Sequence, residues 1–479
     1  MGDIATVILA AGQGRRMKSA LPKVLHRVLG LPLVAFPLAL ARAVKSARTV
    51  VVVGHGREQV EAAVRSVPGG EDARFAVQRE QRGTGHAALS ALPALAGHRG
   101  PVLILSGDVP LLKPQTLERL GRARSKSCSP LAFVTFRPAN PAGYGRVLRQ
   151  DDRVVALREH RDCSRAERAI GEVNAGIYLV DIGFLRRCLK RLSDDNEQGE
   201  LYLTDLVAMA AAGRRPAVTV EALADEVGGV NDRAELARVE ELLRELRNLE
   251  LMRAGVTIRQ PGTVRVELDA EIGADTELGP FVQILGRTRI GRGCAVEAGA
   301  VIADSTLADG ARVLAHSVIE GAVVGAGAAV GPMARLRPGS VLGPAVRVGN
   351  FVEVKNTVMG EGSKANHLAY LGDGAIGRRV NVGAGTIFCN YDGFAKHRTV
   401  LEDDVFIGSD SQLVAPVTVG AGAYVASGST VTKDVPADAL AISRAPQQNR
   451  LKVAAVLRRT LSARKKKADA GKAGGEDPR

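Results

Sequence analysis

A short glycine-rich segment near the N-terminus has the residue types that phosphate chemistry needs. Residues 9–17 follow a β-branched run and contain Gly12, Gly14 and Arg16, and Lys23 comes shortly after them. Glycines at a strand end let backbone amides approach a phosphate. Arg16 and Lys23 supply charge that can stabilise a phosphate and a departing pyrophosphate. A dinucleotide-binding fingerprint would also need a third glycine and an acidic residue about twenty positions on. This chain has neither at the required position, so dinucleotide binding is disfavoured.

The elements that must position this segment are those of a layered α/β domain. Residues 6–9, 49–53 and 102–105 are short β-branched runs, and longer segments with helical apolar spacing separate them up to residue 230. This alternation predicts a Rossmann-like layered sheet, and such sheets carry their ligands at the carboxyl ends of the strands.

A helix is predicted next, over residues 231–255. Asp232 is an N-cap candidate with Glu235 three positions on, and Gly255 ends the run. The apolar positions at helical spacing are Leu236, Val239, Leu243, Leu246 and Leu249. A coiled coil is the alternative, but with barely three heptads we expect the helix to connect and pack between two domains.

From residue 264 the apolar period becomes six. Its members are Ile272, Leu278, Ile284, Ile290, Val296 and Ile302, then after a slip at an expected insertion Val318, Val324, Val330, Leu336, Leu342, Val348 and Val354, then Ile376 and Val382, and finally Leu401, Ile407, Leu413, Val419, Val425 and Val431. This period is typical of a hexapeptide β-helix whose aliphatic residues point inward. Residues 355–375 and 389–400 are expected to interrupt the period and to carry binding residues.

Composition and charge restrict the class of protein. The 479 residues are 46% hydrophobic and 24% charged, which is typical of a globular protein, and no run is apolar enough to cross a membrane. The net charge is +14, but the basic tail at residues 455–479 is expected to be disordered, and the rest lacks the aromatic platforms of nucleic-acid binders. The five cysteines are scattered, so neither a disulfide framework nor a zinc site is indicated and a cytoplasmic location fits.

The N-terminal segment resembles the signature of sugar-phosphate nucleotidyltransferases, L-A-A-G-x-G-x-R-M followed by P-K. Further motifs follow in the order and approximate spacing of the N-acetylglucosamine-1-phosphate uridylyltransferases: Gln78, 83–86 (GTGH), 106–110 (SGDVP), 143–146 (GYGR), Glu159, Asn174 and 229–231 (GVN). The resemblance implies uridylyl transfer from UTP to N-acetylglucosamine 1-phosphate, with release of pyrophosphate.

The roles that this resemblance implies are carried over residue by residue. It assigns Asp108 and Asn231 to Mg²⁺, and Arg16 and Lys23 to catalysis. The nucleotide and sugar site would comprise Leu9, Ala10, Ala11, Gly12, Lys23, Gln78, Gly83, Thr84, Ser106, Gly107, Asp108, Gly145, Glu159, Asn174 and Asn231. Ser106 and Ala175 depart from the residues that the family often has, Tyr and Thr.

The β-helical half is similar to the acetyltransferase half of the bifunctional enzymes that make UDP-N-acetylglucosamine. The resemblance rests on 335–339 (RLRPG), 350–355 (NFVEVK), 364–373 (KANHLAYLGD), 381–386 (NVGAGT), 390–393 (NYDG), 408–410 (GSD), Pro416, Ser427 and 441–444 (AISR). It implies that His367 is the general base, and an ordinary pKa near 6.5 suits removing a proton from an amine that attacks a thioester.

The same resemblance assigns substrates in this half. Glucosamine 1-phosphate would be bound by Arg337, Lys355, Tyr370 and Asn381, and acetyl-CoA by Ala384, Ser409, Ser427 and Arg444; Asn390 and Tyr391 are assigned both beside the sugar and to the acetyl-CoA site. Ser427 stands where the family usually has Ala.

The prediction for the whole chain is a bifunctional enzyme in which two domains act in sequence. Residues 1–230 form the uridylyltransferase domain, 231–255 a connecting helix, 256–454 a left-handed parallel β-helix with acetyltransferase activity, and 455–479 a tail. The resemblance also implies a homotrimer and a product used for cell-envelope polymers. The alternatives are a nucleotidyltransferase with a non-catalytic β-helix and, from another class, a scaffold or nucleic-acid binder that uses the basic tail.

Overall fold

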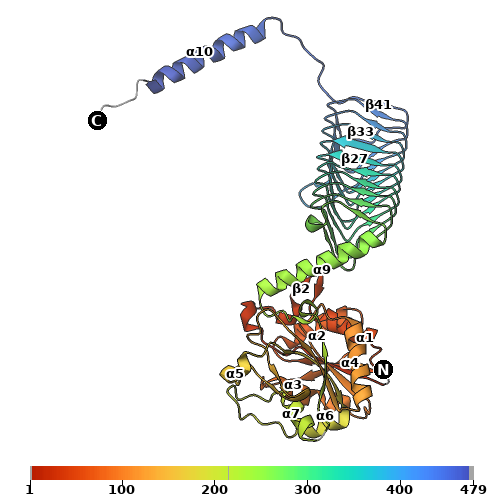
Figure 1. Cartoon of the computed structure of the whole chain (residues 1–479). Coiled ribbons are helices and arrows are strands. Elements are labelled where there is room, and N and C mark those ends of the chain that lie inside the picture. Colours follow the sequence, from red (N-terminus) through yellow and green to blue (C-terminus); the bar gives the residue numbers. More distant parts are fainter. Residues whose placement is uncertain (1–2, 214, 474–479) are drawn as a thin grey trace. The chain divides into compact units, whose positions relative to one another are not determined.

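The computed structural model describes residues 3–213 and 215–473. The chain divides into two compact units, Met1–Glu320 and Gly321–Arg479. The first unit contains an α/β domain, a long helix and the first coils of a β-helix, and the second contains the remaining coils and a C-terminal helix (Figure 1). The division therefore falls inside the six-residue repeat.

The α/β domain is built on a mixed sheet in the order β11-β7-β10-β6-β1-β4-β5, with the β8-β9 hairpin attached to β10. Its strands are β1 (Ala5–Leu9), β4 (Arg48–Val53), β5 (Arg74–Val77), β6 (Pro101–Ser106), β7 (Leu131–Phe136), β8 (Arg146–Gln150), β9 (Arg153–Arg158), β10 (Val173–Asp181) and β11 (Val218–Glu221); β2 (Arg27–Val28) and β3 (Leu31–Pro32) form a separate hairpin. Strands β1, β4, β5 and β6 are parallel, whereas β10 runs antiparallel to β6 and β7.

Helices cover both faces of this sheet. They are α1 (Ala35–Ala43), α2 (Arg57–Ser66), α3 (Thr84–Ala91), α4 (Pro114–Ser127), α5 (Arg165–Arg168), α6 (Ile182–Leu189), α7 (Asp205–Ala212) and α8 (Ala224–Val227), with short 3-10 turns η1 (Arg15–Met17), η2 (Lys23–Leu25) and η3 (Pro93–Leu95). Alternate residues of one strand enter different cores: Val7 of β1 packs with Ile104 of β6, while its neighbour Ile8 packs with Val51 of β4. A strand buried on both faces explains the continuous apolar runs and confirms the predicted layered α/β fold.

The predicted connecting helix is α9 (Arg233–Arg253). The Asp232 side chain caps it by accepting hydrogen bonds from two backbone amides, as the sequence predicted. The helix contacts β2 on one side and β12, β13 and η4 (Pro261–Thr263) on the other. The predicted apolar stripe holds only in its first half: Leu246 and Leu249 are exposed, and Asn248 and Leu251 are buried in their place. The buried face rotates because the helix leaves the α/β domain and begins to pack on the first coils.

The repeat forms a parallel β-helix of three sheets, each taking every third strand. The first sheet has β12 (Thr257–Ile258), β15 (Glu277–Leu278), β18 (Ala295–Val296) and β21 (Arg312–Val313) in the first unit and β24 (Ala329–Val330), β27 (Arg347–Asn350), β30 (Lys364–His367), β33 (Asn381–Val382), β36 (Phe406–Ile407), β39 (Tyr424–Val425) and β41 (Leu440–Ala441) in the second. The second sheet has β13 (Arg265–Val266), β16 (Gln283–Leu285), β19 (Val301–Ala303) and β22 (Val318–Glu320), then β25 (Arg335–Leu336), β28 (Glu353–Lys355), β31 (Tyr370–Gly372), β34 (Ile387–Cys389), β37 (Gln412–Val414) and β40 (Thr430–Val431). The third has β14 (Glu271–Ile272), β17 (Arg289–Ile290) and β20 (Thr306–Leu307), then β23 (Val323–Val324), β26 (Val341–Leu342), β29 (Val358–Met359), β32 (Gly374–Ile376), β35 (Thr399–Leu401) and β38 (Val417–Val419).

The inward column follows the predicted six-residue spacing with two corrections. Val318 was predicted to point inward, but it is 38% exposed and Ile319 is buried instead. The slip is a shortening and not an insertion, because Ile302 pairs with Ile319 seventeen residues later, whereas Ile284 pairs with Ile302 eighteen residues later. Residues 355–375 do not interrupt the column either: Met359, Ala365 and Leu371 are buried in it.

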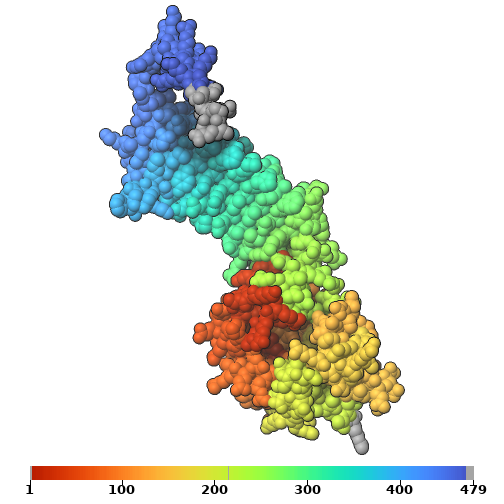
Figure 2. Space-filling view, turned by 90° about the vertical axis from the view of Figure 1, so that its left-hand side faces the viewer, coloured from red at the N-terminus to blue at the C-terminus, as the bar shows by residue number. Residues whose placement is uncertain are grey.

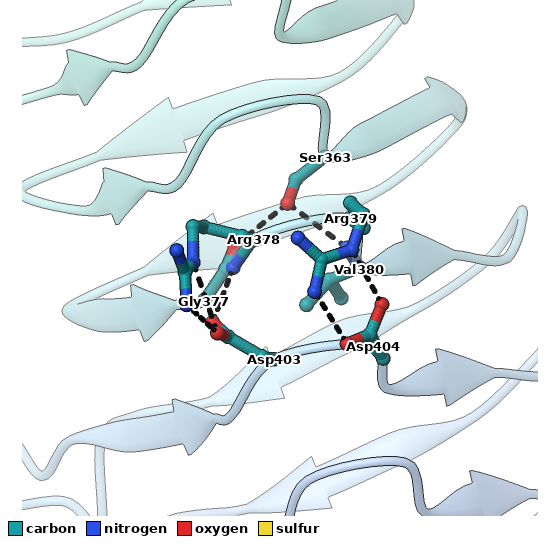
Figure 3. Close-up of polar contacts among 7 residues, drawn as sticks. All are labelled: Ser363, Gly377, Arg378, Arg379, Val380, Asp403 and Asp404. Carbon is teal, nitrogen blue, oxygen red and sulfur yellow. Dashed lines mark hydrogen bonds and ion pairs between the residues drawn. The ribbon is translucent and has the colours of Figure 1, made fainter.

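The long interruption that does occur is a loop between β34 and β35, and charged pairs fasten the coils on either side of it. Arg378 forms a two-pronged ion pair with Asp403, and Arg379 forms a second one with Asp404, each across 25 residues (Figure 3). Beside them the buried Ser363 hydroxyl donates to the Gly377 carbonyl at 2.7 Å and accepts from the Val380 amide at 3.0 Å. These contacts hold the coil spacing where the chain bulges outward.

The basic tail at residues 455–479 was predicted to be disordered, but its described part, up to residue 473, is helical. Residues Val453–Ala473 form α10, because Ala, Leu, Arg and Lys favour helix and no proline interrupts them. Residues 474–479 of the predicted tail lie outside the described residues. In the space-filling view the coils of the second unit follow one another from teal to blue up to α10 (Figure 2). Among the described residues no helix has the length and apolar character to span a bilayer.

Candidate functional sites

A cavity of about 560 Å³ opens at the carboxyl ends of β1 and β6 in the α/β domain. It is lined by the predicted residues Leu9, Ala10, Ala11, Gly12, Lys23, Gln78, Gly83, Thr84, Ser106 and Asp108, together with Gln13, Gly14, Arg15, Val24, Gln81, Ala87 and Glu200. The predicted Gly107 supports its floor by donating its amide to the Leu9 carbonyl at 3.0 Å. A Cβ at Gly107 would lie 2.9 Å from Val24, so only glycine fits.

Four charged and polar side chains meet at this cavity although they are far apart in the sequence. The Lys23 ammonium donates to an Asp108 carboxylate oxygen and to Asn231 Oδ1, the latter at 3.3 Å. The Arg16 guanidinium donates to the same Asn231 oxygen at 2.9 Å. Two hydrogen-bond-accepting oxygens and two cationic side chains therefore lie together, and the positive charge of the cations could attract a phosphate.

The predicted Mg²⁺ ligands fit a magnesium ion on their chemistry. Asp108 offers a carboxylate and Asn231 an amide oxygen, and both oxygens already face a shared cation, the Lys23 ammonium. Mg²⁺ prefers such oxygen ligands and commonly takes only one or two from protein, with water and phosphate completing its shell. No group of three His, Cys, Asp or Glu side chains that could hold a metal occurs in the described part of the chain.

The loop after β5 is fixed by Gln78, which is buried. Its Nε2 donates to the Gly83 carbonyl at 3.0 Å and lies 3.3 Å from His86 Nδ1. Gly83 has a φ of +91°, a conformation that favours glycine. Sequence analysis missed Gln81, whose Nε2 donates to the Ala11 carbonyl at 2.7 Å and so ties this loop to the signature segment.

The residues predicted to hold the sugar form a second group: Gly145 directly precedes β8, Glu159 directly follows β9, and Asn174 lies on β10. The Gly145 carbonyl accepts the Asn174 amide at 2.9 Å, and an added Cβ on Gly145 would contact Glu159. Burial, followed by the nearby carboxylates, raises the pKa of Glu159. The Asn174 side chain donates to the buried Tyr178 hydroxyl at 2.5 Å. Burial raises the pKa of Tyr178, so the phenol stays a neutral hydrogen-bonding group.

The first turn of α9 holds this site together through two residues that sequence analysis did not assign to it. Glu235 Oε2 accepts the backbone amide of Asn231 at 2.6 Å, and Arg233 Nε donates to the Met17 carbonyl at 3.2 Å. The first contact reaches the predicted site residue Asn231, and the second reaches Met17, the neighbour of the predicted Arg16. The only local signal for these two residues was the N-cap pattern of α9. That pattern predicted where the helix begins, but it did not predict the contact between Arg233 and Met17.

In the second unit His367 ends strand β30 and is exposed. Its Nδ1 lies 3.2 Å from Asn350 Oδ1, the residue beside it in the ladder. An amide oxygen can only accept, so this contact places the ring proton on Nδ1 and leaves Nε2 with a lone pair. Such an imidazole can take a proton.

A cluster of cations lies at a different corner of the coils, at the ends of β28 and β31. Lys355 contacts Lys396, and this contact, together with burial, lowers the pKa of Lys355. Arg337 donates to Glu353 at 2.9 Å. Lys396 sits in the loop between β34 and β35 and was missed by the sequence analysis, because nothing local marks a loop lysine as a partner of residue 355.

Hydrogen bonds order the polar residues around these cations. Asp373 accepts from Asn356 Nδ2 at 2.7 Å and from Asn390 Nδ2 at 2.5 Å. Burial opposes ionisation of Asp373, but these bonds and the cations lower its pKa overall. Asn390 Nδ2 also lies 3.5 Å from the Tyr370 hydroxyl, and a Cβ on Gly372 would lie 2.4 Å from that oxygen.

The remaining predicted residues lie in three places. Ala384, Ser409, Ser427 and Arg444 lie on successive coils, where Gly428 N donates to the Ser409 carbonyl and Arg444 to the Ser427 carbonyl, both within 2.8 Å. Asn381 lies on β33 beside Lys364 of the strand that ends in His367. Tyr391 is 60% exposed and donates to the Gly393 carbonyl at 2.6 Å, so it extends from the loop toward solvent.

Comparisons with known proteins cover both halves. Residues 6–174 match the MobA-like NTP transferase domain, residues 260–359 the GMPPB C-terminal domain, and residues 398–433 the bacterial transferase hexapeptide family. Proteins named "Bifunctional protein GlmU" are similar along the chain: one from Pelobacter propionicus is 50% identical over 94% of this chain and 98% of its own length. Those from Anaeromyxobacter sp. and Sorangium cellulosum are 52% and 48% identical over 93% of this chain, and over 91% and 95% of their own lengths.

Proposed function

Because the chain belongs to the family of bifunctional GlmU proteins, we propose how its two sites divide the two reactions. The protein is a bifunctional transferase with nucleotidyltransferase and acetyltransferase activities on UDP-N-acetylglucosamine precursors. The observation that carries the site assignment is the meeting of Lys23, Asp108 and Asn231 at the cavity of the first unit.

In the first unit the cavity binds UTP and the group at Gly145, Glu159 and Asn174 binds N-acetylglucosamine 1-phosphate. The sugar's phosphate oxygen attacks the α-phosphorus of UTP in line with the departing pyrophosphate. Such a reaction needs positioning and charge neutralisation and no protein nucleophile. Lys23 and Arg16 exchange their internal oxygen partners for phosphate oxygens, while Asp108 and Asn231 would hold Mg²⁺, which supplies further positive charge to the phosphates.

In the second unit His367 Nε2 removes a proton from the amine of glucosamine 1-phosphate as the nitrogen attacks the thioester carbonyl of acetyl-CoA. The carbon–sulfur bond then breaks, and CoA leaves as the thiol with the proton that His367 returns. Arg337, Lys355 and Lys396 bind the sugar's phosphate, and Tyr370, Asn381, Asn390 and Tyr391 surround the sugar. The column that ends in Arg444 binds acetyl-CoA, and Asn390 and Tyr391 extend to it. The charge of the cation cluster and the free Nε2 of His367 support this division of roles.

We also propose that the protein acts as a homotrimer. Within one chain, His367 ends β30 and Lys355 ends β28, so strand β31 separates their corners by roughly 10 Å at about 3.3 Å per residue. A neighbouring chain that lies against these coils would bring the two corners of different chains together. All five cysteines are free thiols, which supports a reducing cytoplasm as the compartment.

The test is product analysis by mass spectrometry. The purified protein is mixed with glucosamine 1-phosphate, acetyl-CoA, UTP and Mg²⁺, and a second reaction lacks acetyl-CoA. We expect UDP-N-acetylglucosamine in the complete mixture only. Uridylylation of supplied N-acetylglucosamine 1-phosphate without any acetylation would assign the β-helix a non-catalytic role and contradict the proposal for the second unit.

A further inference from the structure

The C-terminal helix α10 is an unusual element because none of its described side chains, up to residue 470, is covered. All side chains of residues 451–470 are exposed, including Leu457 at 55% and Leu461 at 59%. An isolated helix of this length is only marginally stable in water, and most helices gain their stability by packing an apolar face. A surface that accepts this helix is therefore missing from the structure of the single chain.

The first half of α10 has an apolar stripe on one face. Val453, Val456, Leu457 and Leu461 recur at intervals of three and four residues, which places them along one side of the helix. Thr460 completes that side, and its hydroxyl donates to the Val456 carbonyl at 3.0 Å, which satisfies its polarity within the helix. The stripe is about two turns long, which is too short for a stable coiled coil.

The opposite face and the second half of the helix are strongly basic. Residues 450–470 contain eight cationic side chains and one acidic side chain, and four of the cations are consecutive at residues 464–467. No aromatic side chain occurs in this segment, so it has no group for stacking on nucleic-acid bases. An apolar stripe beside a cationic block is instead the pattern of helices that lie in the interface of an anionic bilayer.

We propose that α10 binds reversibly to the surface of membranes that contain anionic lipids, with Leu457 and Leu461 in the acyl boundary and Lys465, Lys466 and Lys467 against the headgroups. Charge complementarity favours a lipid surface as the binding partner of α10. Such a surface presents negative headgroups next to an apolar acyl layer, which match the cationic block and the apolar stripe of the helix. This role is additional to the two transferase activities and leaves their machinery unchanged.

The test is co-sedimentation of the intact protein with vesicles. One set is pure phosphatidylcholine, and the other contains roughly one third phosphatidylglycerol to give an anionic surface. We expect binding to the anionic vesicles only, reversed by high salt. Replacing residues 465, 466 and 467 by Gln should weaken this binding about 100-fold, since each cation near such a surface contributes about a fivefold factor.

Two single variants with the same charge change separate the stripe from the charge. Leu457→Asp places a carboxylate in the stripe and should weaken binding roughly 10- to 100-fold, because the burial of one leucine is lost. Ser462→Asp lies on the opposite face and should weaken it by less than about fivefold. Both variants should keep both transferase activities. Equal effects of the two variants, binding to neutral vesicles, or displacement from vesicles by single-stranded RNA at low stoichiometry would overturn the proposal.

Discussion

Replacing Lys23 by Met should change catalysis and metal binding in opposite directions. In the structure the Lys23 ammonium hydrogen-bonds both oxygens that are proposed to bind Mg²⁺, Asp108 and Asn231 Oδ1. A metal ion must displace that ammonium before it can bind. Methionine keeps the length of the side chain and removes the charge.

The magnitudes follow from the contacts that are lost. A hydrogen bond to a charged group contributes about 1.5–3 kcal/mol, so removing the competing ammonium should tighten Mg²⁺ binding roughly 10- to 150-fold. The same ammonium would stabilise the transferring phosphates, and loss of one such donor slows reactions of this kind about 10²- to 10³-fold. Asp108 keeps 16% of its side chain exposed, so water can replace the lysine in the metal-free variant.

Calorimetric titration of Mg²⁺ without nucleotide measures the first effect, and uridylyl transfer from UTP measures the second. Acetyl transfer in the other unit is the internal control and should stay unchanged. Lys18→Met is the matched variant, because Lys18 lies exposed at the end of the turn η1, five residues before Lys23, and loses the same charge. If Mg²⁺ binding by the Lys23 variant is unchanged or weaker, the inference that Lys23 holds the metal ligands is refuted.

Three further predictions concern other residues of the two sites, two of them on activity and one on stability. His367→Ala should lower acetyl transfer at least about 100-fold and leave uridylyl transfer intact, and full retention of acetyl transfer in that assay would contradict the general-base role. Lys396→Met should raise the KM for glucosamine 1-phosphate about tenfold or more, with the KM for acetyl-CoA unchanged, because one phosphate contact is lost. Glu159→Gln should raise the free energy of unfolding at neutral pH: burial raises the folded pKa of Glu159, so ionisation costs wild-type stability as pH rises above the ordinary pKa of a glutamate. Urea unfolding at several pH values checks it, and the difference between variant and wild type should vanish in acid.

The sequence predicted the repeating elements well because their causes are local. Each inward aliphatic position of the β-helix is set by a six-residue spacing that can be counted along the chain, and Leu278, Ile284 and Ile290 are buried as counted. The slip at Ile302 was misread because coils of seventeen and of eighteen residues both occur, and pairing across coils, not spacing along them, decides which residue points inward.

The sites were predictable only in part. The contact between Lys23 and Asn231 joins residues 208 positions apart, and no local pattern requires it. The family resemblance supplied both residues, but it gave no sign of Gln81, Arg233 or Lys396, whose partners depend on how loops cross the sheet edge and the coil corner. Loop residues with long-range partners thus mark the limit of reasoning from spacing.

In both candidate sites a carboxylate lies close enough to act on the cationic side chains before substrate binds. Lys23 donates a hydrogen bond to Asp108, and the charge of Asp373 acts on Lys355 and Lys396, so a carboxylate accompanies the cations of each site before a phosphate arrives. This pairing lowers the gain from binding a phosphate, because an internal partner must be given up. It also removes the cost of ordering a flexible lysine at the moment of binding. In the β-helix the contact of Lys355 with Lys396 leaves two like charges close together, and a doubly charged phosphate between them relieves that repulsion. A sugar without a phosphate cannot relieve that repulsion. This difference favours binding of the phosphorylated substrate over the free amino sugar.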